Sequence, residues 1–382
     1  MLSNVVDFIS HHPLNTTDDA SIETWKRTCE TAWNSTIELF LPEEEKMIAN
    51  QCLELVLESS VQFGKLVETQ RTGIVRAWSL EDRKASIQHL LYRPQIEQRT
   101  ESWYQDALGL LSASQFHSIL KPTRTRGQIV LQKATCIPID TSARRTVMMT
   151  CDLNPFTWGI RFEPVVKQIY QHLTSTSVVD LGRLKHRDDP RLAASPDGLV
   201  VEGPPVRVGR FVEFKAPVTR QILKKVPDEY ISQMQIQMEV GNVEECDYLE
   251  VKVQSQYQKK PCDPFLEDAV YRGFLYVIGD EEGHAIRYEY SPLNPSCEWK
   301  LQIEITEQVL ETVPWCTSSW FLMTVGRSRT WFESVQPAIQ SFWEDVAKAK
   351  EGTFVLPPSN RKIKEVQCKI VDDTQDETMN VE

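Results

Sequence analysis

The sequence predicts a mixed α/β (α+β) protein, in which helices flank a mixed central sheet and a helical region precedes this body. Residues 18–92 carry apolar side chains at helical spacing. Residues 177–290 contain short apolar or alternating runs that are typical of strands, and amphipathic helices separate and follow these runs. With 382 residues, the chain is long enough for two or three domains of about 100–200 residues each.

The first predicted helix covers Ile22–Leu39, because two aspartates can cap it and apolar residues recur at spacings of four from Trp25 to Ile37. A second helix begins near Pro42, which three glutamates follow in the first turn. Further along the chain, we predict a short helix over Ser114–Leu120. The next segment, Gln128–Ile139, is predicted as a strand or an extended loop.

The remainder of the body alternates helices with strands. We predict helices over 157–173, 228–240 and 331–350, and strands over 177–181, 197–202, 207–216, 247–254, 273–278 and 284–290. Gly352 can end the last helix. We therefore divide the chain into a helical N-terminal region (1–95), a body (96–352) and an acidic, flexible tail (353–382).

The formal net charge of −12 is concentrated at the two ends of the chain. Residues 1–60 hold 11 acids and 3 bases, and the last twelve residues hold five acids and no base, which leaves +1 for residues 61–370. Within that middle, residues 121–148 carry +5. This basic stretch is either a solvated surface or a surface that faces phosphate groups. The overall balance excludes a basic protein that coats nucleic acid.

The cysteines indicate a reducing environment. There are nine, an odd number, and none forms a Cys-x-x-Cys pair, so we expect free thiols in an intracellular compartment rather than a disulfide framework or a zinc ribbon. No apolar run approaches the ~18 residues of a transmembrane helix, and the N-terminus lacks the pattern of a signal peptide. We therefore expect no membrane partner.

The residues that suggest chemistry lie between positions 193 and 240. If Phe211–Ala216 is a strand, Glu213 and Lys215 share one face of it. Asp197 lies in a Ser-Pro-Asp-Gly turn, and a hairpin would bring it to Glu213. Two carboxylates suit Mg²⁺, and a nearby lysine can assist phosphodiester hydrolysis. Taken singly, Glu-x-Lys is typical of an exposed strand and Ser-Pro-Asp-Gly of an ordinary turn, but their combination favours a site.

Two predicted helices add polar groups. Glu163 lies beside the apolar stripe of helix 157–173, and Gly159, one turn earlier, leaves room for a ligand or a backbone. On helix 228–240, Tyr230, Gln233 and Gln237 share a face, and amides are good donors to phosphate oxygens. A surface glutamate and a solvent-facing polar stripe remain the alternative interpretations.

Four ordered blocks carry a family resemblance over residues 96–255. They are Ile96–Ser114, with Trp103 and a Ser-Ala-Ser motif, then the Trp-Gly-Ile-Arg-Phe-Glu run ending at Glu163, then SPDGL with EFKAP, and finally YISQMQIQM. Together these blocks resemble the PD-(D/E)xK nuclease superfamily and, within it, the lambda exonuclease branch of YqaJ-like viral recombinases, including relatives in large DNA viruses. The resemblance implies a restriction-endonuclease-like fold for residues 96–352, as a nuclease domain with a C-terminal amphipathic helix.

The resemblance also implies roles for individual residues. Asp197 and Glu213 would bind Mg²⁺, for which Mn²⁺ can substitute, with the Phe214 carbonyl as an extra ligand and Glu163 as an outer carboxylate. Lys215 would orient or deprotonate the attacking water, and Gln233 would support the site. The DNA or its 5′-phosphate would be bound by Ser112, Ser114, Ser195, Arg124, Arg126 and Gln235. Ala107 stands where the family usually has the arginine that holds the 5′-phosphate, so the resemblance does not imply a strict need for a 5′-phosphate, and Arg124 and Arg126 are the candidates to replace that arginine.

The activity implied by the resemblance is exonucleolytic digestion of linear double-stranded DNA, 5′ to 3′, for recombination, repair or genome processing. The alternatives are a structure-selective endonuclease, an RNA-degrading nuclease or a DNA-binding module without catalysis. The partners implied are DNA ends, a single-strand annealing protein and further copies of the chain. For a viral protein the location would be the host cytoplasm or nucleus. We expect no iron–sulfur cluster, because Cys246, Cys262, Cys297 and Cys316 are widely spread.

Overall fold

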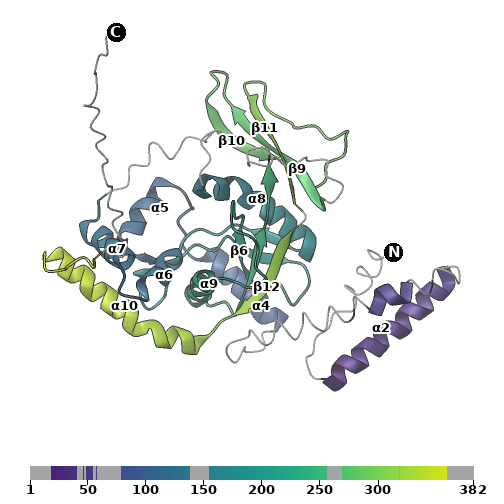
Figure 1. Ribbon diagram of the computed structural model, residues 1–382, viewed down its shortest axis with the longest axis horizontal. Coiled ribbons are helices and arrows are strands. Elements are labelled where there is room, and N and C mark those ends of the chain that lie inside the picture. Colours follow the sequence, from purple (N-terminus) through teal and green to yellow (C-terminus); the bar gives the residue numbers. More distant parts are fainter. Residues whose placement is uncertain are drawn as a thin grey trace, which may run out of the picture.

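A five-stranded mixed sheet forms the centre of the molecule (Figure 1). Its strands, in spatial order, are β12 (Trp320–Gly326), β7 (Glu245–Val251), β6 (Phe211–Lys215), β5 (Gly198–Glu202) and β2 (Ser177–Val179). Strands β6 and β7 are parallel, and the other neighbours are antiparallel. The computed structural model describes residues 19–40, 46, 49–54, 57, 79–137, 155–255, 269–317 and 319–358.

Helix α9 (Asp228–Gly241) connects the two parallel strands β6 and β7, as parallel pairing requires a crossover. It packs on the sheet face that carries Phe211, together with Met234 and Met238 of its own buried side. At its end, a Cβ on Gly241 would lie 2.3 Å from the Phe211 ring, so only glycine permits this close approach. The helix is thereby held directly above β6.

Helix α8 (Pro155–Thr174) covers the opposite face of the sheet. Its apolar stripe, which includes Phe162 and Val166, packs against Val212 and Phe214 of β6. Because side chains alternate along a strand, Phe211, Glu213 and Lys215 face α9 whereas Val212 and Phe214 face α8. The predicted division of the Phe211–Ala216 strand into two faces is confirmed.

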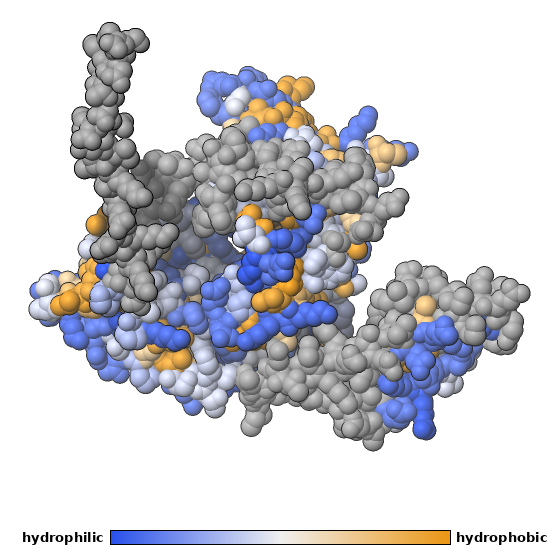
Figure 2. Space-filling model, viewed as in Figure 1, coloured by the Kyte–Doolittle hydropathy of each residue, from blue (hydrophilic) through white to orange (hydrophobic). Residues whose placement is uncertain are grey.

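Two further sheets flank the central one. An antiparallel sheet has the order β10 (Ala285–Tyr290), β9 (Tyr271–Gly279), β11 (Gln308–Thr317) and β8 (Gln254–Ser255), and Figure 1 shows α8 between it and the central sheet. Ile286 of β10 and Val309 of β11 are exposed, as is Ile305 in the turn before β11, and apolar atoms are visible in this part of the molecule in Figure 2. A small sheet has the order β1 (Leu111–Ser112), β4 (Leu192–Ala194) and β3 (Leu184–Lys185).

Six further α-helices and one 3₁₀ helix complete the described elements. They are α2 (Asp19–Phe40), α4 (Leu80–Tyr92), α5 (Glu101–Asp106), the 3₁₀ helix η1 (Ala107–Gly109), α6 (Ala113–Ile119), α7 (Arg124–Thr135) and α10 (Arg329–Lys350). Helix α2 belongs to a separate apolar cluster around Trp33 and Leu53, whereas α4 contributes Ile87 and Leu90 to the main core. Gly352, with φ +77°, follows α10 as predicted.

The predicted fold class is confirmed, since a mixed sheet lies between α8 and α9. One element was predicted wrongly, because the segment from Gln128 belongs to helix α7 rather than to a strand or loop. The Thr123 side chain caps this helix by accepting a hydrogen bond from Arg126 N at 3.2 Å. Strands β11 and β12 were not predicted, and β12 forms an edge of the central sheet.

The expectation of free thiols holds for Cys29, Cys52, Cys136, Cys246 and Cys297 but is wrong for Cys316, which is disulfide-bonded. Within the part of the chain that the structure describes, we find no helix that is long and apolar enough to span a membrane. Part of the basic stretch 121–148 and most of the predicted tail 353–382 lie outside the described residues.

Candidate active site

The β5–β6 hairpin brings Asp197 to Glu213, as expected from the sequence. Asp197 lies just before β5, and its backbone N–H donates to the Val212 carbonyl at 3.2 Å. Its side-chain Oδ2 accepts a hydrogen bond from Phe214 N at 2.7 Å, which fixes the carboxylate beside β6. A Cβ on the next residue, Gly198, would lie 2.4 Å from Val178 of β2, so a glycine is required there.

Glu213 is fully buried, and three side chains bind its carboxylate. Gln233 Nε2 donates to Oε1 at 2.7 Å, Gln237 Nε2 donates to Oε2 at 2.6 Å, and the Lys215 ammonium pairs with Oε1. The two glutamines lie one turn apart on α9, so that both reach the same carboxylate. Gln237 was not among the expected site residues. The sequence did carry a signal for it, because Gln237 shares the polar face of this helix with Gln233.

Lys215 is held in its charged form. Burial alone would lower the pKa of the Lys215 ammonium, but the Glu213 and Asp197 carboxylates outweigh burial and raise it. Its Nζ also lies 5.0 Å from the centroid of the Tyr230 ring, within the range of a cation–π interaction. In this charge state, Lys215 can donate hydrogen bonds but cannot accept a proton.

Glu163 reaches the same region from α8. Arg99 Nη2 donates to both of its oxygens, at 3.1 and 3.0 Å. Burial raises the pKa of Glu163, and Glu213 raises it further, whereas Arg99 and Lys215 lower it. The pKa of Asp197 is raised well above its usual value by burial and by the charges of Glu213 and Glu163. The three carboxylates therefore repel one another electrostatically, and a cation would relieve this repulsion.

These carboxylates line a cleft of about 700 Å³. Ser112, Ser114 and Ser195 also line this cleft, and the hydroxyl oxygens of Ser112 and Ser114 lie 3.1 Å apart. Lys133 is also found there and is nearly fully buried, with its Nζ donating to the Ala107 carbonyl at 2.7 Å. Arg183 lines the same cleft. The cleft is thus lined by the three carboxylates and also by cationic side chains, among them Lys133 and Arg183.

Three expected site residues do not line this cleft. Arg124 donates to the Pro357 carbonyl, and Arg126 forms an ion pair with Asp345 of α10 at 2.6 Å. Residues 124–135 form helix α7 rather than a strand or loop. Arg124 and Arg126 therefore face the residues after α10 and α10 itself, whereas Lys133, further along α7, faces the cleft. Gln235 is buried on another side of α9, where its amide bonds Gly326 O and Ser328 N, both at 2.7 Å. Lys133 and Arg183 were missed because only the tertiary fold brings them to the serines.

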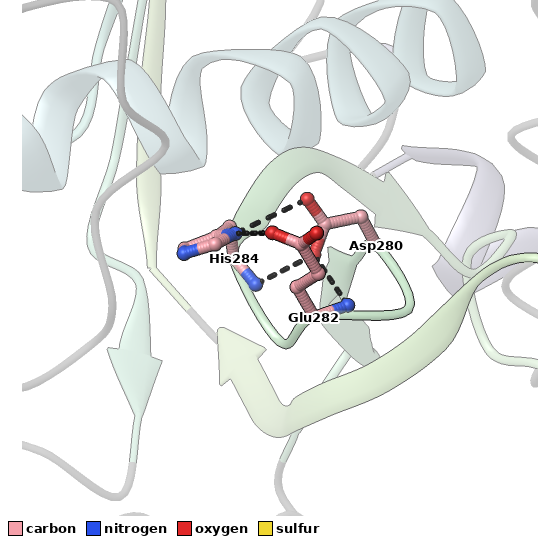
Figure 3. A group of neighbouring side chains, drawn as sticks. All are labelled: Asp280, Glu282 and His284. Atoms are coloured by element: carbon pink, nitrogen blue, oxygen red, sulfur yellow. Dashed lines mark hydrogen bonds and ion pairs between the residues drawn. The ribbon is translucent and has the colours of Figure 1, made fainter.

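The donor set suits a hard divalent cation, because Asp197, Glu213 and Glu163 present carboxylate oxygens to one cleft, with Glu213 fully buried and the other two half-buried. Among the described residues, only Asp280, Glu282 and His284 bring three ligand atoms within 4.8 Å of one another (Figure 3). That triad lies in the β9–β10 turn, where Asp280 Oδ1 accepts hydrogen bonds from the backbone N–H groups of Glu282 and His284. Ordinary turn geometry therefore accounts for it. The carboxylates in the cleft lie further apart than this triad.

Comparisons with known proteins agree with the resemblance seen in the sequence. Residues 102–244 match the model of the YqaJ-like viral recombinase domain. The uncharacterized protein R354 of Acanthamoeba polyphaga mimivirus is 27% identical over 173 residues, which is 42% of this chain and 30% of that protein. The chain thus spans less than a third of the length of that relative.

The chain also matches two solved structures at low sequence identity. The alkaline exonuclease LHK-Exo of Laribacter hongkongensis has a TM-score of 0.41 and 17% identity, covering 66% of this chain and 95% of the exonuclease. The shutoff and exonuclease protein of Kaposi's sarcoma-associated herpesvirus has a TM-score of 0.25 and 11% identity, covering 73% and 76% of the two chains.

Proposed function

We propose, from the premise that residues 102–244 belong to the YqaJ-like viral recombinase domain family, that this protein is a divalent-metal-dependent deoxyribonuclease. It would digest linear double-stranded DNA from an end, 5′ to 3′, in recombination, repair or genome processing. The single strand left behind would be the substrate of an annealing protein. The observation that carries the proposal is the convergence of Asp197, Glu213 and Lys215 in one cleft, with both Glu213 oxygens bound by α9 glutamines.

Asp197 and Glu213 would hold Mg²⁺ or Mn²⁺, with the Phe214 carbonyl as a further oxygen ligand and Glu163 as an outer carboxylate. When bound, the ion supplies Lewis-acid stabilisation of the charge that develops on the phosphate. The protein's own contribution is orientation. Gln233 and Gln237 fix the plane of the Glu213 carboxylate, and Phe214 N fixes Asp197, so neither group has to reorganise during the reaction.

Lys215 would act on the attacking water. As long as the neighbouring carboxylates keep its pKa raised, its ammonium orients the water by donating a hydrogen bond. Neutralisation of those carboxylates removes the cause of the raised pKa, and the amine then becomes able to accept a proton. Orientation and proton transfer therefore belong to two charge states of the same residue.

The cleft residues Ser112, Ser114, Ser195 and Lys133 would bind the 5′-phosphate. Ser112, Ser114 and Ser195 supply hydroxyl donors, and Lys133 supplies charge close to the position of Ala107. Burial, followed by the neighbouring Arg183, lowers the pKa of Lys133 to about 8. Since the ammonium is present below that pH and is lost above it, affinity for a 5′-phosphate should decline as the pH rises through about 8.

The decisive experiment compares the wild type with Asp197→Asn on labelled linear duplex, closed circular DNA and RNA, in Mg²⁺ and in Mn²⁺. Asparagine can still accept the hydrogen bond from Phe214 N, so the fold should be retained. We expect the wild type to degrade linear duplex and the variant to lose about 1,000-fold or more of this activity. The matched control is Asp280→Asn in the β9–β10 turn, which should keep full activity.

Each other outcome has a definite meaning. Full activity of Asp197→Asn would overturn the assignment of the site. Cleavage of closed circles or of RNA at a comparable rate would favour an endonuclease or an RNA-degrading enzyme. Binding of DNA by the wild type without cleavage in either metal would favour a DNA-binding module without catalysis.

End recognition is tested with duplexes that carry a 5′-phosphate or a 5′-hydroxyl. We expect the wild type to prefer the 5′-phosphate below pH 8, and Lys133→Met to reduce that preference by about tenfold. The control is Lys121→Met, which removes an exposed lysine just before α7. An unchanged preference in Lys133→Met would show that Lys133 does not contact the phosphate.

A further inference from the structure

Arg99 has an unusual backbone, with φ +66°, in the left-handed region that residues other than glycine, asparagine and aspartate rarely adopt. The residues on either side fix this conformation. The Gln98 side chain donates to the Leu181 and Pro196 carbonyls at 2.8 and 3.1 Å, and the Thr100 hydroxyl caps α5 by accepting from Trp103 N. Backbone strain that is held in place in this way is common at functional sites.

The fixed backbone directs the Arg99 guanidinium at Glu163, whose two oxygens it binds from a single nitrogen. The ion pair lies where the 700 Å³ cleft meets a second cavity of about 540 Å³, because Arg99, Glu163, Asp197 and Phe214 line both. Its side chains are 44% and 34% exposed. Arg99 therefore pairs with one of the three candidate metal carboxylates while remaining accessible to solvent and substrate.

A partly exposed ion pair of this kind is weak and can be exchanged. Glu163 cannot give both of its oxygens to Arg99 and also turn fully towards a cation beside Asp197 and Glu213. Once Glu163 turns away, Arg99 is left as an exposed guanidinium on a rigid loop at the edge of the cleft. Guanidinium groups bind phosphates through paired hydrogen bonds, so a phosphate of the DNA is the natural replacement partner.

We propose that Arg99 is an exchangeable counter-ion, which neutralises Glu163 in the metal-free protein and transfers to a DNA phosphate when Glu163 turns to a divalent cation. This inference rests on the proposed nuclease function. It makes Arg99 a positioning residue with two partners, and it couples metal loading to DNA binding. Arg99 opposes the cation in the absence of DNA, and it strengthens DNA binding once the cation is present.

The test measures the two affinities separately in Arg99→Ala. Titration calorimetry with Mn²⁺ alone should show about fivefold tighter binding than in the wild type, because the competing guanidinium is gone. Anisotropy of labelled duplex in Ca²⁺, with hydrolysis checked to be absent, should show about tenfold weaker DNA binding. In EDTA, the DNA affinities of the two proteins should agree within about twofold. A merely structural role would lower both affinities.

Two further variants separate charge from backbone strain. Arg99→Gly suits the positive φ better than alanine does, so equal effects in both variants assign the change to the lost guanidinium. Arg187→Ala is the control, since it removes an exposed arginine that forms an ion pair with the adjacent Asp188. It should change neither affinity.

The inference is overturned if Arg99→Ala leaves Mn²⁺ affinity unchanged or lowers it, or if it loses DNA affinity equally in EDTA. If the variant gives one of these results while the wild type binds Mn²⁺ and cleaves DNA, only the role of Arg99 is overturned and the proposed function remains intact. By contrast, a wild type that binds no divalent cation and cleaves no DNA would refute the proposed function itself.

Discussion

Three glutamines of α9 lie close together in sequence but have different partners. Gln233 and Gln237 donate to the buried Glu213 carboxylate, whereas Gln235 holds Gly326 and Ser328 on the other side of the helix. At the scale of single residues, the helical period of 3.6 decides which amide serves the candidate active site. A motif read only as a string of letters does not separate these two roles.

We expect Gln237→Ala to reduce nuclease activity by about 10–100-fold, because Glu213 Oε2 loses its donor and the carboxylate is no longer fixed. Gln235→Ala should instead lower the melting temperature, since it leaves two buried backbone groups without their partner, and should change the activity of the folded protein little. Steady-state kinetics and thermal unfolding of both variants check this contrast. Equal kinetic defects would contradict it.

At the scale of elements, the position of α9 above β6 depends on a contact between backbone and ring. Gly241 lies so close to Phe211 that an added Cβ would stand 2.3 and 2.4 Å from two ring carbons. Gly159 of α8 is the opposite case, since a Cβ there meets nothing within 4 Å. Both glycines are helical, but only one of them is required for packing.

Gly241→Ala should destabilise the protein by about 1–3 kcal/mol, because the added methyl group overpacks the interface between α9 and β6. Gly159→Ala should have the opposite sign, stabilising α8 by about 0.5–1 kcal/mol through helix propensity. Urea unfolding of both variants measures the difference. A neutral Gly241→Ala would show that α9 can move away from β6 without cost.

At the scale of the whole molecule, a buried ionic network joins α8, the loop between β5 and β6, and two strands of the central sheet. Asp247 of β7 binds Arg207 and Arg210, and it accepts hydrogen bonds from the hydroxyls of Tyr170 on α8 and Thr324 on β12 at 2.7 Å each. Burial would raise the pKa of Asp247, but the two arginines and these hydrogen bonds lower it to about 2.

The pKa of Asp247 is about 2 in the folded protein and near 3.8 in the unfolded chain. The ionised carboxylate therefore stabilises the fold fully above pH 3.8, and this stabilisation is lost as the pH falls to about 2. The free energy of unfolding should decrease by about 2 kcal/mol across this window from Asp247 alone. Asp247→Asn should cost about 3–5 kcal/mol at pH 7, because it leaves buried arginines uncompensated, and far less at pH 2.

Denaturant unfolding at several pH values checks this prediction, with Asp228→Asn as the exposed control. The control should follow the wild type at every pH. A constant difference between Asp247→Asn and the wild type from pH 7 to pH 2 would contradict the linkage.

The sequence by itself determined the local features of this protein. The alternation of β6 separated Glu213 and Lys215 from Val212 and Phe214, and the helical spacing of Tyr230, Gln233 and Gln237 marked the polar side of α9. These signals could be read because periods of 2 and 3.6 residues depend only on near neighbours in the chain. The expected placement of Asp197 beside β6 also followed, because a hairpin is a local structure.

Only the tertiary structure decided what depends on distant contacts. The sequence predicted a strand or an extended loop over residues 128–139, whereas the structure has helix α7 from Arg124 to Thr135, which packs against α10 and directs Arg126 to Asp345. Arg99 meets Glu163 across 64 positions of the chain, and Lys133 meets Ala107 across 26. The physical reason is that such pairs are brought together by burial of the whole core, which no local period encodes.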